Sequence, residues 1–281
     1  MKTLRRVTGA SAVALLISIQ AAGASPIHDA AHRGDLTSLR TLLNADSLLV
    51  HARDSLGATP LHFAALGGHQ GVVEFLLGRN AAVDARDDYG STPLHYAMRG
   101  GPRYPAIEGA FVDVSGLEAM HRPGDTLRQA ADIPWVAVVS TLIGRRADVD
   151  AADRFGATPL HRAAGAGRLL LVRSLIGRSA TVDARDINGR SALHWASQAG
   201  NATLTVELLR EQSDANAVDN DGRTPLHFAA MYNRRDIAQI LVERGARVET
   251  RDDEGRTARE YAEREGDQAM VEMLRLRDTD R

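Results

Sequence analysis

Apolar residues fall into short segments that have the spacing of one helix face. Two clear examples lie at residues 72–77 and 169–176, where Val, Leu, Ile or Phe recur three and four positions apart. Other short segments carry paired alanines, whose small side chains allow two helices to approach closely. The pairs are Ala64-Ala65, Ala163-Ala164 and Ala229-Ala230. The pattern predicts short helices that alternate between a small-residue type and an amphipathic type.

The small-residue segments begin with a repeated tetrapeptide. Four copies read Thr-Pro-Leu-His and one reads Ser-Ala-Leu-His, and a weak copy follows at Thr257. The five clear copies start at positions 59, 92, 158, 191 and 224, so they lie 33 residues apart except for one interval of 66. Self-similarity at a fixed period predicts a repeat protein, in which each unit packs against its neighbours.

Each copy also has an Asp five residues before it and a Gly two residues before it. The aspartates are Asp54, Asp87, Asp153, Asp186, Asp219 and Asp252, and the glycines are Gly57, Gly90, Gly156, Gly189, Gly222 and Gly255. Gly supplies turn conformations that are closed to other residues. Thr can cap a helix, and Pro is well tolerated at the first helical position. Each copy therefore predicts a tight turn that leads directly into a helix.

The unit resembles the ankyrin repeat, and the resemblance extends from Pro26 to Leu276. It implies an all-α repeat solenoid of stacked helix-turn-helix units joined by β-turn or hairpin loops. We expect about eight units including two caps, within a domain spanning residues 25–281. The expected units are 25–56, 57–89, 90–122, 123–155, 156–188, 189–221, 222–254 and 255–281.

The loop after the second helix departs from the family pattern, in which Gly commonly takes a left-handed conformation. Gly245 follows this pattern, but the equivalent positions of other units are Asn80, Arg146, Ser179 and Gln212. Each non-Gly residue held there costs about 1 kcal/mol. We expect an array less stable than an idealised one.

The 66-residue interval between Thr92 and Thr158 is irregular. Residues 127–131 fall in register with a first helix and residues 136–143 with a second, but Gly and Pro at 100–105 interrupt the pattern before them. In one arrangement, residues 90–122 form a unit with a rebuilt second helix. In the other, residues 101–134 form a long excursion inside a single repeat. The preserved 33-residue register favours the first, and long irregular segments on regular scaffolds often carry function.

The first 24 residues have the features of a secretion signal. Lys2, Arg5 and Arg6 form a positive region, residues 7–19 are uncharged, and Ala22-Gly23-Ala24 fits a small-x-small cleavage site. We expect cleavage before Ser25 and a periplasmic or secreted product, exported by the general or the twin-arginine route. The apolar run is too short to span a membrane, which needs about 20 residues, so we expect no span after cleavage.

Composition agrees with an all-helical protein without a nucleic-acid partner. Hydrophobic residues make up 44% and aromatics only 4%, which suits packing through Ala, Leu and Val. The formal charge of −2 gives no global field that would attract nucleic acid. The chain has no cysteine, so a disulfide framework is excluded and an oxidising compartment is tolerated.

The residue types that usually carry chemistry belong mostly to the repeat. The resemblance implies that the motif histidines bond backbone between neighbouring turns: His28, His62, His95, His161, His194 and His227. The other four histidines lack metal-ligand spacing, so we expect no metal, cofactor or catalysis. The aromatic residues that follow these histidines are expected to pack in the core, and Arg162 in the same position to be exposed. An alternative is an enzyme whose acid-base groups lie in the irregular segment 101–124, at Glu108, Asp113, Glu118 and His121.

Ankyrin proteins usually bind partners through turn tips and the exposed side of the first helices. Interfaces favour aromatics and Arg. Transferred position by position, the resemblance predicts a partner-binding surface at Leu56, Tyr89, Arg99, Arg154, Phe155, Ile187, Arg190, Gln198, Arg223, Met231 and Tyr232.

These features favour a non-catalytic, monomeric protein-protein interaction module in the periplasm. Such a module would bind, protect or inhibit one partner protein, for example as an immunity or accessory protein. Two other hypotheses remain open, namely an exported effector that acts on host proteins and the enzyme described above.

Overall fold

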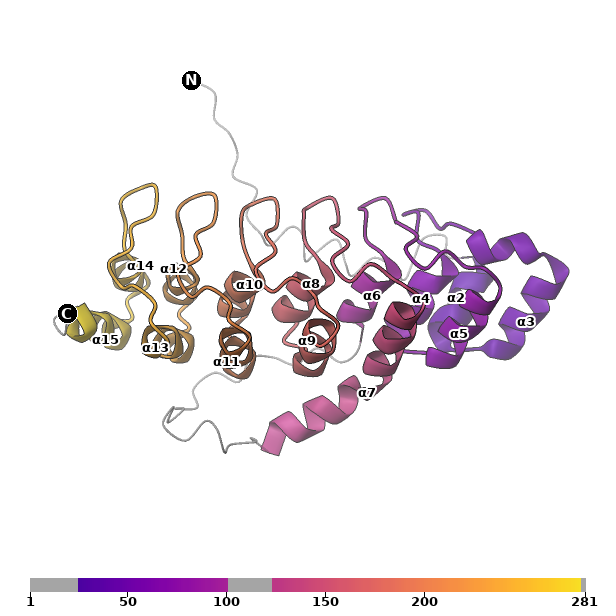
Figure 1. The fold of residues 1–281 in the computed structure, drawn as a ribbon, viewed down its shortest axis with the longest axis horizontal. Coiled ribbons are helices and arrows are strands. Elements are labelled where there is room, and N and C mark those ends of the chain that lie inside the picture. Colours follow the sequence, from indigo (N-terminus) through magenta and orange to yellow (C-terminus); the bar gives the residue numbers. More distant parts are fainter. Residues whose placement is uncertain (1–24, 101–122, 279–281) are drawn as a thin grey trace, which may run out of the picture.

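The computed structural model describes residues 25–100 and 123–278 as a stack of paired helices (Figure 1). The fourteen α-helices of these residues form seven pairs, and a short 3-10 helix, η2 (Ser47–His51), follows the first pair. No strand occurs in these two ranges. The first helices are α2 (Pro26–Arg33), α4 (Pro60–Gly67), α6 (Pro93–Arg99), α8 (Pro159–Gly165), α10 (Ala192–Ala199), α12 (Pro225–Met231) and α14 (Ala258–Glu265). The second helices are α3 (Leu36–Ala45), α5 (Gln70–Gly78), α7 (Pro123–Gly144), α9 (Leu169–Ile176), α11 (Ala202–Arg210), α13 (Arg235–Glu243) and α15 (Gln268–Asp278).

The two kinds of helix form two parallel rows. Each first helix packs against the first helices of neighbouring pairs and against its own second helix, and hairpin loops between pairs all project from one side of the stack (Figure 1). This arrangement confirms the predicted all-α repeat solenoid. Among the described residues, no helix is both long and apolar enough to cross a membrane.

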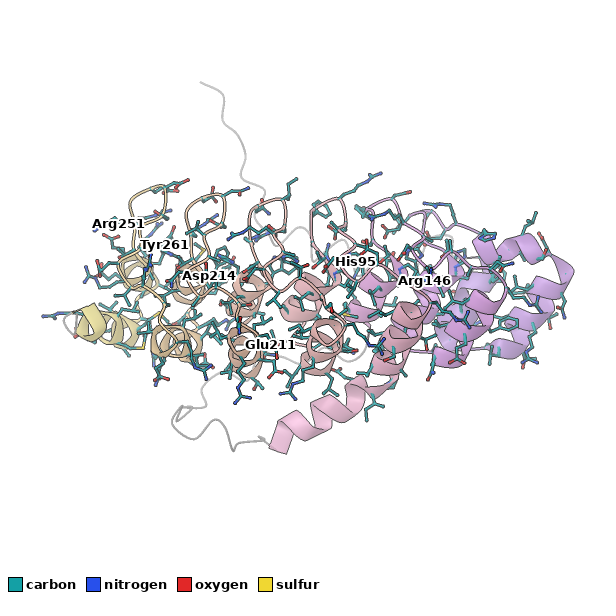
Figure 2. All side chains as sticks on the ribbon, viewed as in Figure 1. His95, Arg146, Glu211, Asp214, Arg251 and Tyr261 are labelled. Atoms are coloured by element: carbon teal, nitrogen blue, oxygen red, sulfur yellow. The ribbon has the colours of Figure 1, made fainter. Side chains whose placement is uncertain are left out.

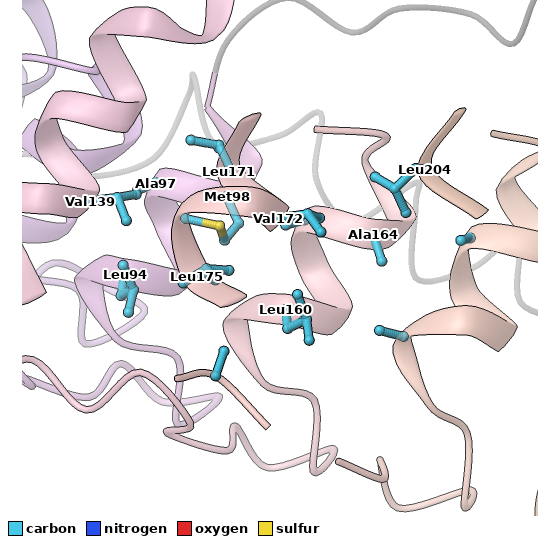
Figure 3. Close-up of a cluster of buried hydrophobic side chains, with 14 of the residues drawn as sticks. Leu94, Ala97, Met98, Val139, Leu160, Ala164, Leu171, Val172, Leu175 and Leu204 are labelled. Atoms are coloured by element: carbon cyan, nitrogen blue, oxygen red, sulfur yellow. The ribbon is translucent and has the colours of Figure 1, made fainter. Parts of the chain in front are cut away.

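The core runs the length of the stack between the two rows. The motif leucines Leu61, Leu94, Leu160, Leu193 and Leu226 are almost completely buried, as are the paired alanines. Around the centre, Leu94 and Met98 of α6 lie near Val139 of α7 and Leu171 and Leu175 of α9 (Figure 3). Small residues on the first helices and larger ones on the second fill the space between rows, as the sequence pattern predicted.

The motif histidines connect neighbouring units through the backbone. In α4 the Nδ1 of His62 accepts the Thr59 N–H at 3.0 Å, and its Nε2 lies 3.1 Å from the Ser91 carbonyl of the next hairpin. Nε2 therefore carries the proton. The same arrangement recurs at His95, which is labelled in Figure 2, and at His161, His194 and His227. The structural role that the family resemblance implied is confirmed.

The loops after the second helices have the left-handed conformation predicted for them. Asn80, Arg146, Ser179 and Gln212 have φ between 64° and 67°, and Gly245 has φ of 91°. Four units therefore hold a side chain where the backbone favours glycine.

The described residues depart from the predicted eight units at one point, because residues 93–99 and 123–144 supply the two helices of a single pair. Helix α6 packs between α4 and α8, while α7 packs between α5 and α9, so α6 and α7 are the two helices of a single pair. His95 accordingly bonds Ala157, which is 62 residues away, where His62 bonds a carbonyl 29 residues away. In the sequence, the extra residues fall between α6 and the part of α7 that packs in the row. This agrees with the second arrangement considered above, in which residues 101–134 form a long excursion inside a single repeat. Residues 101–122 fall outside the described ranges.

Helix α7 is longer than the other second helices at its N-terminal end. Its Leu142 carbonyl accepts the Ala147 N–H, as the Leu175 carbonyl of α9 accepts the Ala180 N–H, so these two leucines are equivalent. On this alignment the residues of α7 before Val136 have no counterpart in α9, and this part of the helix projects away from the row (Figure 1).

Trp135 fixes the point where α7 joins the stack. Its indole N–H donates to the Leu66 carbonyl at 3.0 Å. A Cβ added at Gly100 would lie 2.1 Å from the Trp135 Nε1, and one added at Gly68 would lie 2.9 Å from its Cε2, so both positions require glycine beside this ring. The Arg168 guanidinium packs over the Trp135 ring, with its central carbon 5.1 Å from the ring centroid.

A buried ion pair adjoins this tryptophan. The Arg168 Nε donates to Asp132 Oδ1 at 2.6 Å, and both side chains are almost fully buried. Burial raises the pKa of the Asp132 carboxyl above its usual value, against the lowering effect of Arg168. Removing one partner of such a pair leaves an uncompensated buried charge. The pair therefore ties the base of the projecting helix to the loop before α9.

Candidate protein-interaction surface

Each hairpin is organised by its motif aspartate. In the hairpin at 153–157, Asp153 Oδ1 accepts the Phe155 N–H at 2.8 Å and the Ala157 N–H at 3.0 Å. Gly156 completes the turn with φ of 69°. The five equivalent aspartates accept the same two bonds, so every hairpin presents its tip in the same way.

Neighbouring hairpins are joined at their tips by one backbone hydrogen bond each. The Arg154 N–H donates to the Tyr89 carbonyl and the Ile187 N–H donates to the Phe155 carbonyl, both at 2.8 Å. The remaining bonds of the row are Asp88 to Leu56, Asn220 to Asn188 and Asp253 to Asp221. The tips therefore form one continuous row along the stack.

Arginines before the motif aspartate add a second connection, which the sequence analysis missed. The Arg53 guanidinium donates to the Arg86 carbonyl at 2.8 Å, Arg86 donates to the Ala152 carbonyl at 2.7 Å, and Arg185 donates to the Val218 carbonyl. Their 33-residue recurrence was a signal that could have revealed them. We call these contacts arginine bridges; the equivalent positions Ala152 and Val218 carry no side chain that can form one.

Three predicted tip residues form an exposed apolar strip on adjacent hairpins. Tyr89 is 37% exposed, Phe155 52% and Ile187 64%. We call these three residues the tip strip. Leu56, predicted for the same surface, lies on the preceding tip and is half-buried. The structure brings these four predicted residues together on one row.

The predicted arginines of the hairpins differ in how their charge is used. Arg190 and Arg223 are half-buried and pair with their own motif aspartates, Asp186 at 3.1 Å and Asp219 at 3.2 Å. Arg154 is exposed and pairs with no acidic side chain among the described residues. Only Arg154 of these three therefore offers its charge to a partner.

The predicted residues on the first helices lie apart from the tips. Arg99, Gln198 and Met231 are half-buried, and Arg99 stacks over Tyr96 at 5.4 Å. Tyr232 is 41% exposed and stacks on Phe228. These positions give a weaker candidate surface than the tips.

The aromatic residues that follow the motif histidines face inward, as predicted. Phe63, Tyr96 and Phe228 are buried and Trp195 is half-buried. The Tyr96 hydroxyl and the Trp195 indole N–H each donate to their own motif aspartate at 3.0 Å. Arg162, expected to be exposed, is instead half-buried, because it pairs with Asp153 and stacks over Trp195.

The acid-base candidates Glu108, Asp113, Glu118 and His121 lie outside the described residues. Within the described ranges, no group of three or more His, Asp or Glu side chains is placed to hold a metal ion. His62, His95, His161, His194 and His227 have both ring nitrogens engaged with the backbone, which leaves them no lone pair for a metal.

Short stretches of the chain are similar to parts of several larger proteins. Human ankyrin repeat domain-containing protein SOWAHB is 42% identical over 65 residues, which is 21% of this chain and 8% of that protein. A Caenorhabditis elegans transient receptor potential cation channel subfamily A member 1 homolog is 27% identical over 140 residues, or 50% of this chain and 11% of that protein. Human ankyrin repeat and SOCS box protein 1 is 40% identical over 65 residues, or 21% of this chain and 19% of that protein. The matched regions thus span less than a fifth of each relative.

The family comparison covers most of the chain. The family described as "Ankyrin repeats (3 copies)" matches residues 27–108, 127–208 and 197–280. The paired helices, the projecting hairpins and the histidine bonds between units agree with this match. The chain belongs to the ankyrin-repeat family.

Proposed function

We propose that the chain is a protein-interaction module that binds one partner protein through its hairpin tips, without catalysis of its own. The observation that carries the proposal is the tip strip: Tyr89, Phe155 and Ile187 are exposed on three consecutive hairpins of a rigidly bonded row. Contiguous exposed apolar side chains are characteristic of interaction sites, and aromatics are enriched there.

The regular backbone of the row favours a preorganised surface. The aspartate bonds and the tip-to-tip bonds hold the three side chains on fixed supports. A surface that needs little ordering loses less free energy on association. The proposal therefore places the binding energy in the tip strip rather than at the helix positions Gln198, Met231 and Tyr232.

We also propose that the module acts outside the cytoplasm, in the periplasm, where it would protect or inhibit its partner. The support is the sequence of residues 1–24, with its positive start and its small-x-small site. N-terminal sequencing of the product isolated from its own cells tests this. A start close to Ser25 supports export, and a product that retains Lys2 contradicts it.

Site-specific crosslinking tests the binding surface. The full chain would carry a photo-crosslinking amino acid at position 155 or, as a control, at position 178, an exposed arginine on the loop after α9. We expect a discrete protein adduct from position 155 and not from position 178. The triple variant Tyr89→Ser, Phe155→Ser, Ile187→Ser should still fold, because all three side chains are exposed, and should compete poorly with the unmodified chain for this adduct.

Equal adducts from positions 155 and 178, or full competition by the triple variant, would contradict a tip-mediated interaction.

A further inference from the structure

One cation on the row of tips, Arg154, has no acidic partner among the residues that the structure describes. Arg154 lies at the tip of the hairpin at 153–157, between Tyr89 on one side and Phe155 on the other, because its own N–H is bonded to the Tyr89 carbonyl at 2.8 Å. It is exposed, and its guanidinium makes no hydrogen bond or ion pair with any described residue. An Arg that is neutralised by an acid of its own hairpin would have no free charge to offer a binding partner.

The other tip arginines show why Arg154 is different. Arg190, Arg223 and Arg256 stand four residues after their motif aspartates and pair with them at 3.0–3.2 Å. Arg154 follows Asp153 directly. Both oxygens of Asp153 are already used, since Oδ1 accepts two backbone N–H groups and Oδ2 pairs with Arg162.

Asp88, an exposed acid that directly precedes Tyr89 on the same hairpin, is also engaged. It lies 3.7 Å from the Arg53 guanidinium. The stem of Arg154 meanwhile runs beside Gly90: a Cβ at that glycine would lie 3.3 Å from the Arg154 Cγ and 3.1 Å from its backbone nitrogen. Because Gly90 has no side chain, the stem of Arg154 can pass beside it.

We propose that the tip row recognises a protein segment in which an Asp or Glu side chain is flanked by apolar residues. The carboxylate binds the Arg154 guanidinium, and the apolar neighbours pack on Tyr89 and Phe155, with Ile187 next along the row. Arg suits this role because its planar fork can donate two parallel hydrogen bonds to one carboxylate. The inference rests on the proposed function, whose binding surface it supplies with a ligand chemistry.

A random peptide library displayed on phage provides the probe. Selection on the full chain should enrich peptides with Asp or Glu beside Leu, Ile, Val or an aromatic residue. Selection on Arg154→Gln should not enrich acidic residues, whereas Arg178→Gln, which removes another exposed charge, on the loop after α9, should select like the unmodified chain. Far-UV circular dichroism checks that each variant keeps its helices.

A double-mutant cycle with one enriched peptide measures the contact itself. Changing the peptide's acid to its amide should weaken binding to the unmodified chain about tenfold to a hundredfold, as expected for a charge-assisted pair. The same change should have little effect on binding to Arg154→Gln, because the partner charge is then absent.

The outcomes separate this inference from the proposed function. Peptides that lose binding to the triple tip-strip variant but bind Arg154→Gln unchanged overturn the acidic-segment inference and leave the tip surface in place. Peptides that bind the triple variant unchanged count against both. Enrichment of peptides without acids, or no enrichment at all, also overturns the inference.

Discussion

At the scale of single residues, the motif histidines make the fold sensitive to acid. They are buried between units and bonded through both ring nitrogens in the neutral form. Burial lowers the pKa of His62, His95 and His194 to about 4, despite nearby carboxylates such as Asp87 that raise it.

The first prediction is therefore a loss of stability between pH 6.5 and about pH 4. In that window the unfolded chain binds protons that the folded chain excludes, so the free energy of unfolding falls as pH falls. Each of the three histidines contributes on the order of 3 kcal/mol at full effect. Urea unfolding midpoints at pH 7.0, 6.0 and 5.0 measure this, and His194→Gln should show a shallower fall than the unmodified chain. A midpoint independent of pH over this range would contradict the prediction.

A second prediction concerns the left-handed loops. Gln212 has φ of 64°, which costs a non-Gly residue about 1 kcal/mol, while glycine loses more chain entropy on folding. Gln212→Gly should therefore raise the free energy of unfolding by about 0.5 kcal/mol. Gly245→Ala is the matched opposite: its Cβ would meet no atom within 4 Å, so any loss of stability comes from the backbone alone. We expect the urea midpoint to rise in Gln212→Gly and to fall in Gly245→Ala. Shifts of the same sign in the two variants would contradict this prediction.

At the scale of elements, the hairpins are tied together unevenly. Arginine bridges from Arg53, Arg86 and Arg185 reach the next hairpin, but Ala152 and Val218 leave two junctions without such a bridge. Exposed amide bonds with fewer supports open more easily.

The third prediction is that Ala152→Arg supplies the missing bridge to the Arg185 carbonyl. Amide hydrogen exchange at Ile187, whose N–H is bonded to Phe155, should slow several-fold, and the free energy of unfolding should rise by about 0.5–1 kcal/mol. Ala152→Gln, which has no guanidinium to span the junction, serves as control. Equal exchange rates in the two variants would show that the bridge is not formed.

At the scale of the whole molecule, the sequence predicted the repeated features of the stack but not the number of units. The cause is the insertion between Gly100 and Trp135. The Thr-Pro-Leu-His copies, the turn aspartates and the turn glycines are local signals, and they correctly predicted the hairpins and the first helices that follow them. The number of units depended on the 66 residues between Thr92 and Thr158. Because the insertion is one repeat long, the register of the flanking motifs is the same whether or not those residues form a unit.

The candidate surface was predictable to a similar degree. Exposure of Tyr89, Phe155 and Ile187 followed from their place in the turn. The ion pairs of Arg190 with Asp186 and of Arg223 with Asp219 were not predicted, although the four-residue spacing within each pair is visible in the sequence. The pairing of Arg162 with Asp153, which leaves Arg154 available, requires the fold, because the two residues stand on a helix and a hairpin nine positions apart.

The fourth prediction is that the stack survives removal of the insertion. Deleting residues 102–134 restores the spacing of a regular unit, with Trp135 in the place that His69 has before α5. Arg168→Met would accompany the deletion, because the loss of Asp132 otherwise leaves a buried charge. We expect a cooperative helical unfolding transition and unchanged peptide binding at the tips. A protein without such a transition would indicate that the deleted residues are part of the core.

The contact between Gly100 and Trp135 has a practical consequence. The chain leaves the array at Gly100 and re-enters it at Trp135, and these two residues lie in direct contact. A foreign domain with neighbouring termini, such as a fluorescent reporter, could be grafted there. The ankyrin array would then carry the added domain at this internal position, and its hairpin tips would stay accessible to a ligand. An uninterrupted solenoid accepts such a fusion most readily at its two ends.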